Sequence, residues 1–134
     1  MLSKQIAHAL SVRMSQQPGL HGREVLLEQR AATQTVMPGM WELPSLHEAA
    51  VPEAELRMTV RHAIMQVNYY VRIRTVFEDD VPALTVAGGE RRWVPLSVAG
   101  GMALTGLARK VLSRAHLLPK APLDLIAPAL EEDM

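Results

Sequence analysis

The sequence predicts a single α+β domain, with helix packed on a mixed β-sheet, and three observations support this prediction. The chain has 134 residues, which is enough for one domain with its own hydrophobic core. Several segments alternate apolar and polar residues, as expected for strands that are buried on one face. One later segment, residues 104–115, instead repeats its apolar residues with the period of a helix.

The strands are predicted from this alternation. In residues 68–78, for example, Tyr69, Val71 and Ile73 share one face while polar or charged side chains occupy much of the other. A turn that contains proline and glycine separates the first two strands, so we expect a hairpin there. Strands are predicted at 5–14, 23–29, 57–63, 68–78 and 91–96, with a further strand ending near Pro44 and a short edge piece at 83–87.

The helix at 104–115 is predicted from its apolar stripe, which includes Leu107 and Val111. Thr105 is expected to cap its N-terminus, because a threonine hydroxyl can accept from a free backbone N–H of the first turn. A short helical turn is expected after Pro52, since proline is tolerated at the start of a helix.

The C-terminal end differs from the rest of the chain. Residues 119–134 contain three prolines and end in acidic side chains, so we predict a tail beside a folded domain of residues 1–118. Four of the 14 acidic residues lie in the last eleven positions, which contain no base. The whole chain has 14 bases and 14 acids, so its formal net charge is zero. Without the last eleven residues, 14 bases and 10 acids are left.

Composition excludes several kinds of site. The chain has no cysteine, which excludes disulfides, cysteine-ligated zinc and iron–sulfur clusters and favours a reducing, cytoplasmic location. No apolar run is long enough to span a membrane. A nucleic-acid binder usually has a basic excess, which this chain lacks. Eleven of its 14 bases are arginine, the better partner for phosphates and bases, but a genome rich in G and C explains the same bias.

Two groups of residues carry a resemblance to a known family, the Nudix-like C-terminal domain of adenine DNA glycosylases of the MutY family. There, a strand ending in two leucines and an arginine precedes the string gly-leu-trp-glu-phe-pro, and a trp-val-pro-leu strand and a basic helix follow later. The resemblance covers about residues 5 to 115, in the family's order. The matching residues are Leu26, Leu27, Arg30, Gly39, Met40, Trp41, Glu42, Leu43, Pro44, His62, Tyr70, Val71, Trp93, Val94, Pro95, Leu96, Arg109, Lys110, Val111 and Leu112.

This resemblance implies a fold and a function. The implied fold is a Nudix-like α/β/α sandwich around a mixed sheet, with a shortened Nudix-box region. The implied function is non-catalytic recognition of 8-oxoguanine during DNA repair, without a cofactor. The implied partner is DNA that contains oxidised guanine, or a glycosylase catalytic domain. The sequence leaves open whether the domain stands alone or belongs to a longer chain.

Two other functions stay open, a Nudix-type nucleotide hydrolase and a protein-interaction scaffold that has lost both activities. Hydrolytic Nudix enzymes place several carboxylates on one helix face to hold Mg²⁺ and activate water. Here the acids after Gly39 lack that spacing, so we predict no catalytic and no metal-binding residues. We interpret these acids as solvated charges: Glu42, Glu48, Glu53 and Glu55.

The resemblance places lesion recognition at Ile64, Met65 and Gln66, where the family has an aromatic, a hydroxyl and a histidine. An aliphatic side chain or a thioether can still wedge against a base, and an amide can bond a base edge. An ordinary tight connection between two strands explains the same residues.

Arg61, Arg72 and Arg74 are the predicted phosphate contacts, and Tyr70 shares a strand face with two of them. An aromatic among arginines is typical of surfaces that follow a nucleic-acid backbone. A half-exposed strand with solvated arginines explains the pattern equally well. The remaining polar and aromatic candidates are interpreted as structural: His8 and His62 as satisfied histidines of the core or its edge, and Trp41 and Trp93 as core anchors.

Overall fold

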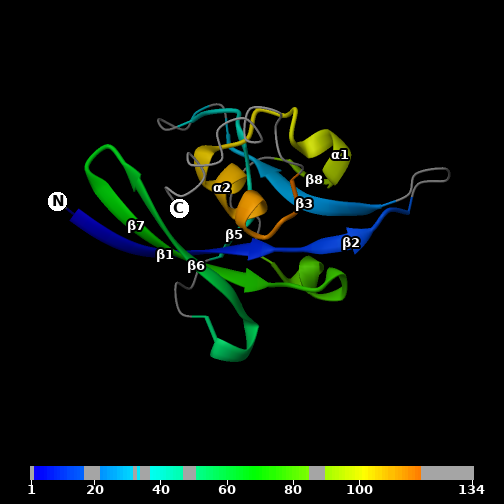
Figure 1. The fold of residues 1–134 in the computed structure, drawn as a ribbon, viewed down its shortest axis with the longest axis horizontal. Coiled ribbons are helices and arrows are strands. Elements are labelled where there is room, and N and C mark those ends of the chain that lie inside the picture. Colours follow the sequence, from blue (N-terminus) through cyan, green and yellow to red (C-terminus); the bar gives the residue numbers. More distant parts are fainter. Residues whose placement is uncertain are drawn as a thin grey trace.

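The computed structural model describes residues 2–16, 22–31, 33, 37–46, 51–84 and 90–118. They form two β-sheets, with helix α2 on the inner side of the first sheet, toward the second (Figure 1). The elements in chain order are β1 (Leu2–Leu10), β2 (Val12–Met14), β3 (Arg23–Gln29), β4 (Trp41–Glu42), β5 (Ser45–Leu46), the 3₁₀ helix η1 (Glu53–Glu55), β6 (Leu56–Ile64), β7 (Val67–Thr75), the 3₁₀ helix η2 (Glu78–Ala83), β8 (Arg91–Pro95), α1 (Leu96–Ala99) and α2 (Gly106–Arg114).

The first sheet has the strand order β5-β1-β7-β6. β1 runs parallel to β7, whereas β5 and β6 are antiparallel to their neighbours, so the predicted mixed sheet is confirmed. β6 and β7 form a hairpin whose two turn residues, Met65 and Gln66, lie in the left-handed region, with φ of 49° and 69°. This turn geometry suits the right-handed twist of a hairpin, although it favours asparagine and glycine.

The second sheet is built around β3. Val25 pairs with Val12 of β2 and with Val94 of β8, so these two strands lie on opposite sides of β3. Near the other end of β3, Glu28 pairs with Glu42 of β4 and with Arg91 of β8. β4 therefore lies on the side of β3 that is opposite to β8, which is the same side as β2. All pairings in this sheet are antiparallel, and the central position of β3 buries five consecutive residues.

The chain passes between the sheets at two places. Ser11 separates β1 from β2, and its carbonyl accepts from Leu26 N–H at 3.0 Å in the second sheet. The carbonyl of Leu10, one residue earlier, accepts from Val76 N–H at 3.1 Å beside the first sheet. The second passage lies between β4 and β5, where Pro44 O accepts from Ala9 N–H at 2.8 Å. The chain therefore connects the two sheets at these two places.

Helix α2 closes the core between the sheets. Its N-cap is Thr105, whose hydroxyl accepts from Ala108 N–H at 3.1 Å, as the sequence predicted. Its buried face meets the inner faces of both sheets. The core residues are Leu10, Val25, Leu27, Trp41, Leu43, Val60, Val71, Ile73, Val94, Ala99, Leu104, Leu107, Ala108, Val111, Leu112, Ala115 and Leu117.

The predicted elements are confirmed with four corrections. α2 and most of each strand lie where they were predicted, and the turn after Pro52 is η1. The strand predicted at 5–14 is interrupted at Ser11, and the strand predicted at 68–78 ends at Thr75, because Glu78 begins η2. The edge piece at 83–87 is wrong at Ala83, which ends η2, and its residues 85–87 lie outside the described part. Leu96 begins the short helix α1 and does not belong to the preceding strand. The predicted tail, 119–134, lies outside the described residues.

The two tryptophans differ in their surroundings. Trp41 is 9 % exposed and belongs to the core, as predicted. Trp93 is only half-buried, so its interpretation as a core anchor is wrong. Its ring lies under the Arg13 guanidinium, 4.2 Å from the ring centre, which is cation–π geometry. Among the described residues, no helix is both long and apolar enough to cross a membrane.

Candidate functional site

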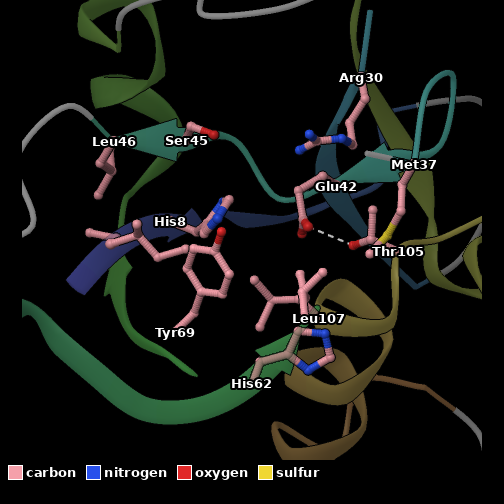
Figure 2. Close-up of a pocket in the computed structure, with 13 residues that line it drawn as sticks. His8, Arg30, Met37, Glu42, Ser45, Leu46, His62, Tyr69, Thr105 and Leu107 are labelled. Carbon is pink, nitrogen blue, oxygen red and sulfur yellow. Dashed lines mark hydrogen bonds between the residues drawn. The ribbon is translucent and has the colours of Figure 1, made fainter. Parts of the chain in front are cut away.

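A cavity of about 320 Å³ lies between the inner face of the first sheet and the end of β4. Its volume is within the range of sites that hold small molecules. Figure 2 shows Glu42, Thr105 and Met37 on one side of it, and His8, Tyr69 and Leu46 on the other. The lining residues are Ile6, Ala7, His8, Arg30, Met37, Glu42, Ser45, Leu46, His62, Ile64, Tyr69, Thr105 and Leu107.

Glu42 is held in the wall of this cavity by two hydrogen bonds. It is 7 % exposed; its Oε2 accepts from the Thr105 hydroxyl at 2.5 Å, and its Oε1 accepts from Leu43 N–H at 2.8 Å. A carboxylate offers about four acceptor positions, so these bonds leave acceptor capacity toward the cavity. The interpretation of Glu42 as a solvated charge is wrong, because α2 brings the Thr105 hydroxyl against it (Figure 2).

Glu42 also has a second carboxylate as its neighbour. Glu28 stands directly opposite it in the register of β3 and β4, and it is 6 % exposed. Like charges at opposite positions of a strand pair repel each other. Arg91 Nε lies 3.0 Å from Glu28 Oε1 and neutralises that carboxylate. The two glutamates therefore have separate donors, and only Glu42 is among the residues that line the cavity.

The other acids of the predicted box region do not join Glu42. Glu53 is exposed, as predicted, and Glu55 forms an ion pair with Arg74 at 3.1 Å. Glu48 lies outside the described residues. Within the described ranges, no group of three or more histidine, cysteine, aspartate or glutamate side chains could hold a metal ion.

The two histidines of the cavity have different environments. His8 is buried and satisfied, as predicted, with Nδ1 2.8 Å from Leu43 O. A carbonyl only accepts, so Nδ1 carries the hydrogen, and Nε2 of the neutral ring is an acceptor. His62 Nδ1 is instead buried without a partner in the described structure, so its interpretation as a satisfied histidine is wrong. Burial, and then the positive charge of Lys110, lower the pKa of His62 below 6.5.

The predicted recognition residues divide between the cavity and the tip of the hairpin. Ile64, the last residue of β6, lines the cavity. Met65 and Gln66 form the turn that follows, and Met65 is 82 % exposed. Both adopt positive φ without being glycine, a strained conformation that is enriched at functional sites. Only Ile64 thus lines the cavity, Met65 and Gln66 follow it in the hairpin turn, and the role of all three in recognition stays a prediction.

The predicted phosphate contacts lie on the other face of the first sheet. Arg72 and Arg74 alternate with Val71 and Ile73, whose side chains belong to the core. Arg72 Nη1 donates to Gln5 Oε1 at 2.9 Å, and Arg74 is already paired with a glutamate. Arg61 also points away from the core, since it pairs with Tyr70 across the hairpin, and it is exposed. These three arginines therefore face away from the cavity.

Sequence reasoning missed most of the cavity. Glu42 had a local signal, because it is the one charged residue in an otherwise apolar string between Trp41 and Pro44. Thr105 was predicted only as a cap, and its second bond, to Glu42, joins residues that lie far apart in the sequence. Tyr69 was assigned correctly to one strand face, but no local pattern shows that this face borders a cavity.

The fold is similar to solved structures of Nudix proteins. A Nudix hydrolase from M. smegmatis, RenU, is 24 % identical, with a TM-score of 0.50, over 84 % of this chain and 83 % of that one. The Nudix domain of Shewanella oneidensis NrtR, solved with ADP ribose, is 17 % identical, with a TM-score of 0.59, over 86 % of each chain. No protein-family model and no curated protein sequence matches the chain. At such identities the likeness concerns the fold alone, and the chain therefore has a Nudix-like α+β fold.

Proposed function

We propose that this chain is a non-catalytic recognition domain that binds a purine base in the cavity between its two sheets. The base that fits the resemblance to the MutY family is an oxidised guanine in DNA, which would place the protein in DNA repair and in the cytoplasm. The observation that carries the proposal is the Glu42 carboxylate, which is buried, oriented by Thr105 and Leu43, and incompletely used.

The chemistry of guanine matches this carboxylate. Guanine presents two adjacent donors, N1–H and the N2 amino group, and a carboxylate can accept from two such donors side by side. The walls of the cavity supply the apolar and aromatic surface on which a base packs, from Ile6, Leu46 and Tyr69. The NrtR Nudix domain, which has the same type of fold, was solved with a nucleotide derivative, ADP ribose.

His8 supplies a reason to prefer the oxidised base. Its Nδ1–H donates to Leu43 O. In the neutral ring, Nε2 is then an acceptor, and His8 is one of the residues that line the cavity. Guanine has an acceptor at N7, whereas 8-oxoguanine has a donor, N7–H. An acceptor in the protein therefore favours the oxidised base, because two acceptors facing each other leave both without a hydrogen bond.

The turn beside the cavity can act on the strand that carries the base. Met65 is exposed at the tip of the hairpin, directly after Ile64 of the cavity wall. An apolar side chain in this position can wedge between stacked bases and help one of them leave the helix. Gln66 can bond a base edge or a phosphate from the same turn.

The test is a titration of two fluorescently labelled duplexes that differ only in one base, 8-oxoguanine or guanine. We expect tighter binding of the oxidised duplex. Glu42→Gln should weaken binding of both by about 5- to 150-fold, the range for losing one bidentate base contact. His8→Phe should instead remove the preference between them. Glu53→Gln, an exposed carboxylate of η1, is the matched control. Equal affinity of the parent protein for both duplexes would contradict lesion recognition.

A nucleotide hydrolase is the second candidate, because RenU, one of the similar structures, is a Nudix hydrolase. Nucleoside triphosphates and dinucleotides should be incubated with the protein and Mg²⁺, with phosphate release as the readout. Turnover that is abolished in Glu42→Gln would favour the hydrolase over the recognition domain. If neither turnover nor base binding is found, the interaction scaffold is the function that stays open.

A further inference from the structure

β6 is an edge strand of the first sheet, and helix α2 lies beside part of it. At the start of the helix, a Cβ on Gly106 would lie 3.4 Å from His62 Cε1. Halfway along it, Lys110 Nζ donates to the carbonyl of Arg61 at 3.2 Å. Beyond its end, Arg57 lines a second cavity, of about 210 Å³, together with Ala115. The helix and the strand thus approach each other at these three places.

This contact gathers basic side chains. We call it the α2–β6 seam and define it by Arg23, Arg57, His62, Lys110 and Arg114. Arg61, whose side chain lies on the other face of the sheet, contributes its backbone carbonyl and a nearby positive charge. His62 belongs to the first cavity at one end, and Arg23 and Arg57 line the second cavity at the other. The helical members are four residues apart, and this spacing puts Lys110 and Arg114 on one face of α2.

The cations of the seam are not neutralised within the described residues. The five ion pairs found there use Arg13, Arg74, Arg91 and Arg92, and none of these belongs to the seam. A formal net charge of zero for the whole chain therefore conceals a strip of excess positive charge. Such a strip attracts an anionic partner at a distance and raises its local concentration.

The cations of the seam also destabilise one another's charged forms. Burial, and then the charges of Arg114 and Arg61, lower the pKa of Lys110 below 10.5. Arg114 Nε is buried without a hydrogen-bond partner in the described structure. An anion bound in the seam would reduce this mutual repulsion, which is a reason for the seam to be occupied when the protein functions.

We propose that the α2–β6 seam binds the phosphates of one nucleic-acid strand, from the mouth of the Glu42 cavity to the second cavity beside Arg57. Five residue steps of β6, from 57 to 62, span about 17 Å at roughly 3.3 Å each. This length matches about five nucleotides of one strand in the stacked, B-form geometry, at roughly 3.4 Å of helix axis per nucleotide. The proposal rests on the proposed function, since the strand in the seam is the one whose base enters the cavity.

The experiment uses a labelled oligothymidine of twelve nucleotides, which contains no guanine and therefore tests the seam without the base contact. Binding is measured by fluorescence anisotropy at several salt concentrations. For the double variant Arg57→Gln, Lys110→Gln we expect at least tenfold weaker binding at low salt. The slope of log K against log salt should fall by about 1.4, which is roughly 0.7 for each phosphate contact with a single strand.

The matched control is Lys4→Gln, Arg92→Gln, which removes the same charge from exposed positions outside the seam and should leave the slope unchanged. A third pair, Arg72→Gln, Arg74→Gln, tests the outer face of the first sheet. An unchanged slope in the seam variant, a loss only in the outer-face variant, or no binding by the parent protein would each overturn the proposal. Preference for 8-oxoguanine that survives any of these results would leave the proposed function standing.

Discussion

Replacing Thr105 with valine tests the link between helix α2 and the cavity. Valine keeps the shape of threonine but removes its hydroxyl, which donates to Glu42 at 2.5 Å and accepts from Ala108 N–H at 3.1 Å. Loss of an N-cap costs about 1 kcal/mol. Loss of a hydrogen bond to a charged group costs about 1.5–3 kcal/mol, since the buried carboxylate is left without its donor.

The expected destabilisation is therefore about 2.5–4 kcal/mol. This is a large share of the roughly 5–15 kcal/mol by which a domain is stable. The free energy of unfolding is measured by urea denaturation, with the fluorescence of Trp41 and Trp93 as the signal. Thr105→Ser is the control, because it keeps the hydroxyl and should lose only about 0.8 kcal/mol for one methyl group.

A double-mutant cycle separates the two parts of this loss. Glu42→Ala, which removes both acceptor oxygens, and Thr105→Val are combined, and the coupling energy between them reports the hydrogen bond without the cap. We expect a coupling of about 1 kcal/mol or more, as for residues that share a buried bond. A loss below 1 kcal/mol in Thr105→Val, or a coupling indistinguishable from zero, would show that Thr105 does not hold the carboxylate and would refute the reasoning.

Three further predictions concern the core, the cavity histidine and the hairpin turn. Trp41→Ala should cost about 3–5 kcal/mol in urea denaturation because the ring is buried in the core, and Trp93→Ala clearly less because its ring is half-exposed; equal losses would contradict this difference. The lowered pKa of His62 means that the unfolded chain binds its proton more readily, so the free energy of unfolding should fall as the pH drops below about 6.5. His62→Gln should flatten this dependence between pH 7.5 and 5.5, and an unchanged slope would show that another group causes it. Changing Met65 to asparagine and Gln66 to glycine should stabilise the domain by roughly 1–2 kcal/mol, because both positions have positive φ; in thermal unfolding, no gain would mean that the turn is not strained.

The sequence by itself determined the elements and much of their order. Alternation placed the long strands β6 and β7, and the helical stripe with its cap at Thr105 placed α2. These signals are local, since an apolar face and a capping hydroxyl act within one or two turns or along one strand. The string around Trp41 also pointed to the Nudix-like fold, which the similar structures confirm.

Only the tertiary structure decided which polar residues are functional candidates. Glu42 has the same charge as the exposed Glu53, and although Glu42 stands among apolar residues, the local sequence does not show which group its carboxylate meets. The difference arises because the fold brings the Thr105 hydroxyl to the Glu42 carboxylate. This hydrogen bond offsets part of the free-energy cost of burying the charge. The seam has the same origin, because arginines spread over most of the chain become neighbours when α2 packs along β6. Charge and burial depend on distances in space, and distances between remote residues are set by packing, not by the order of residues.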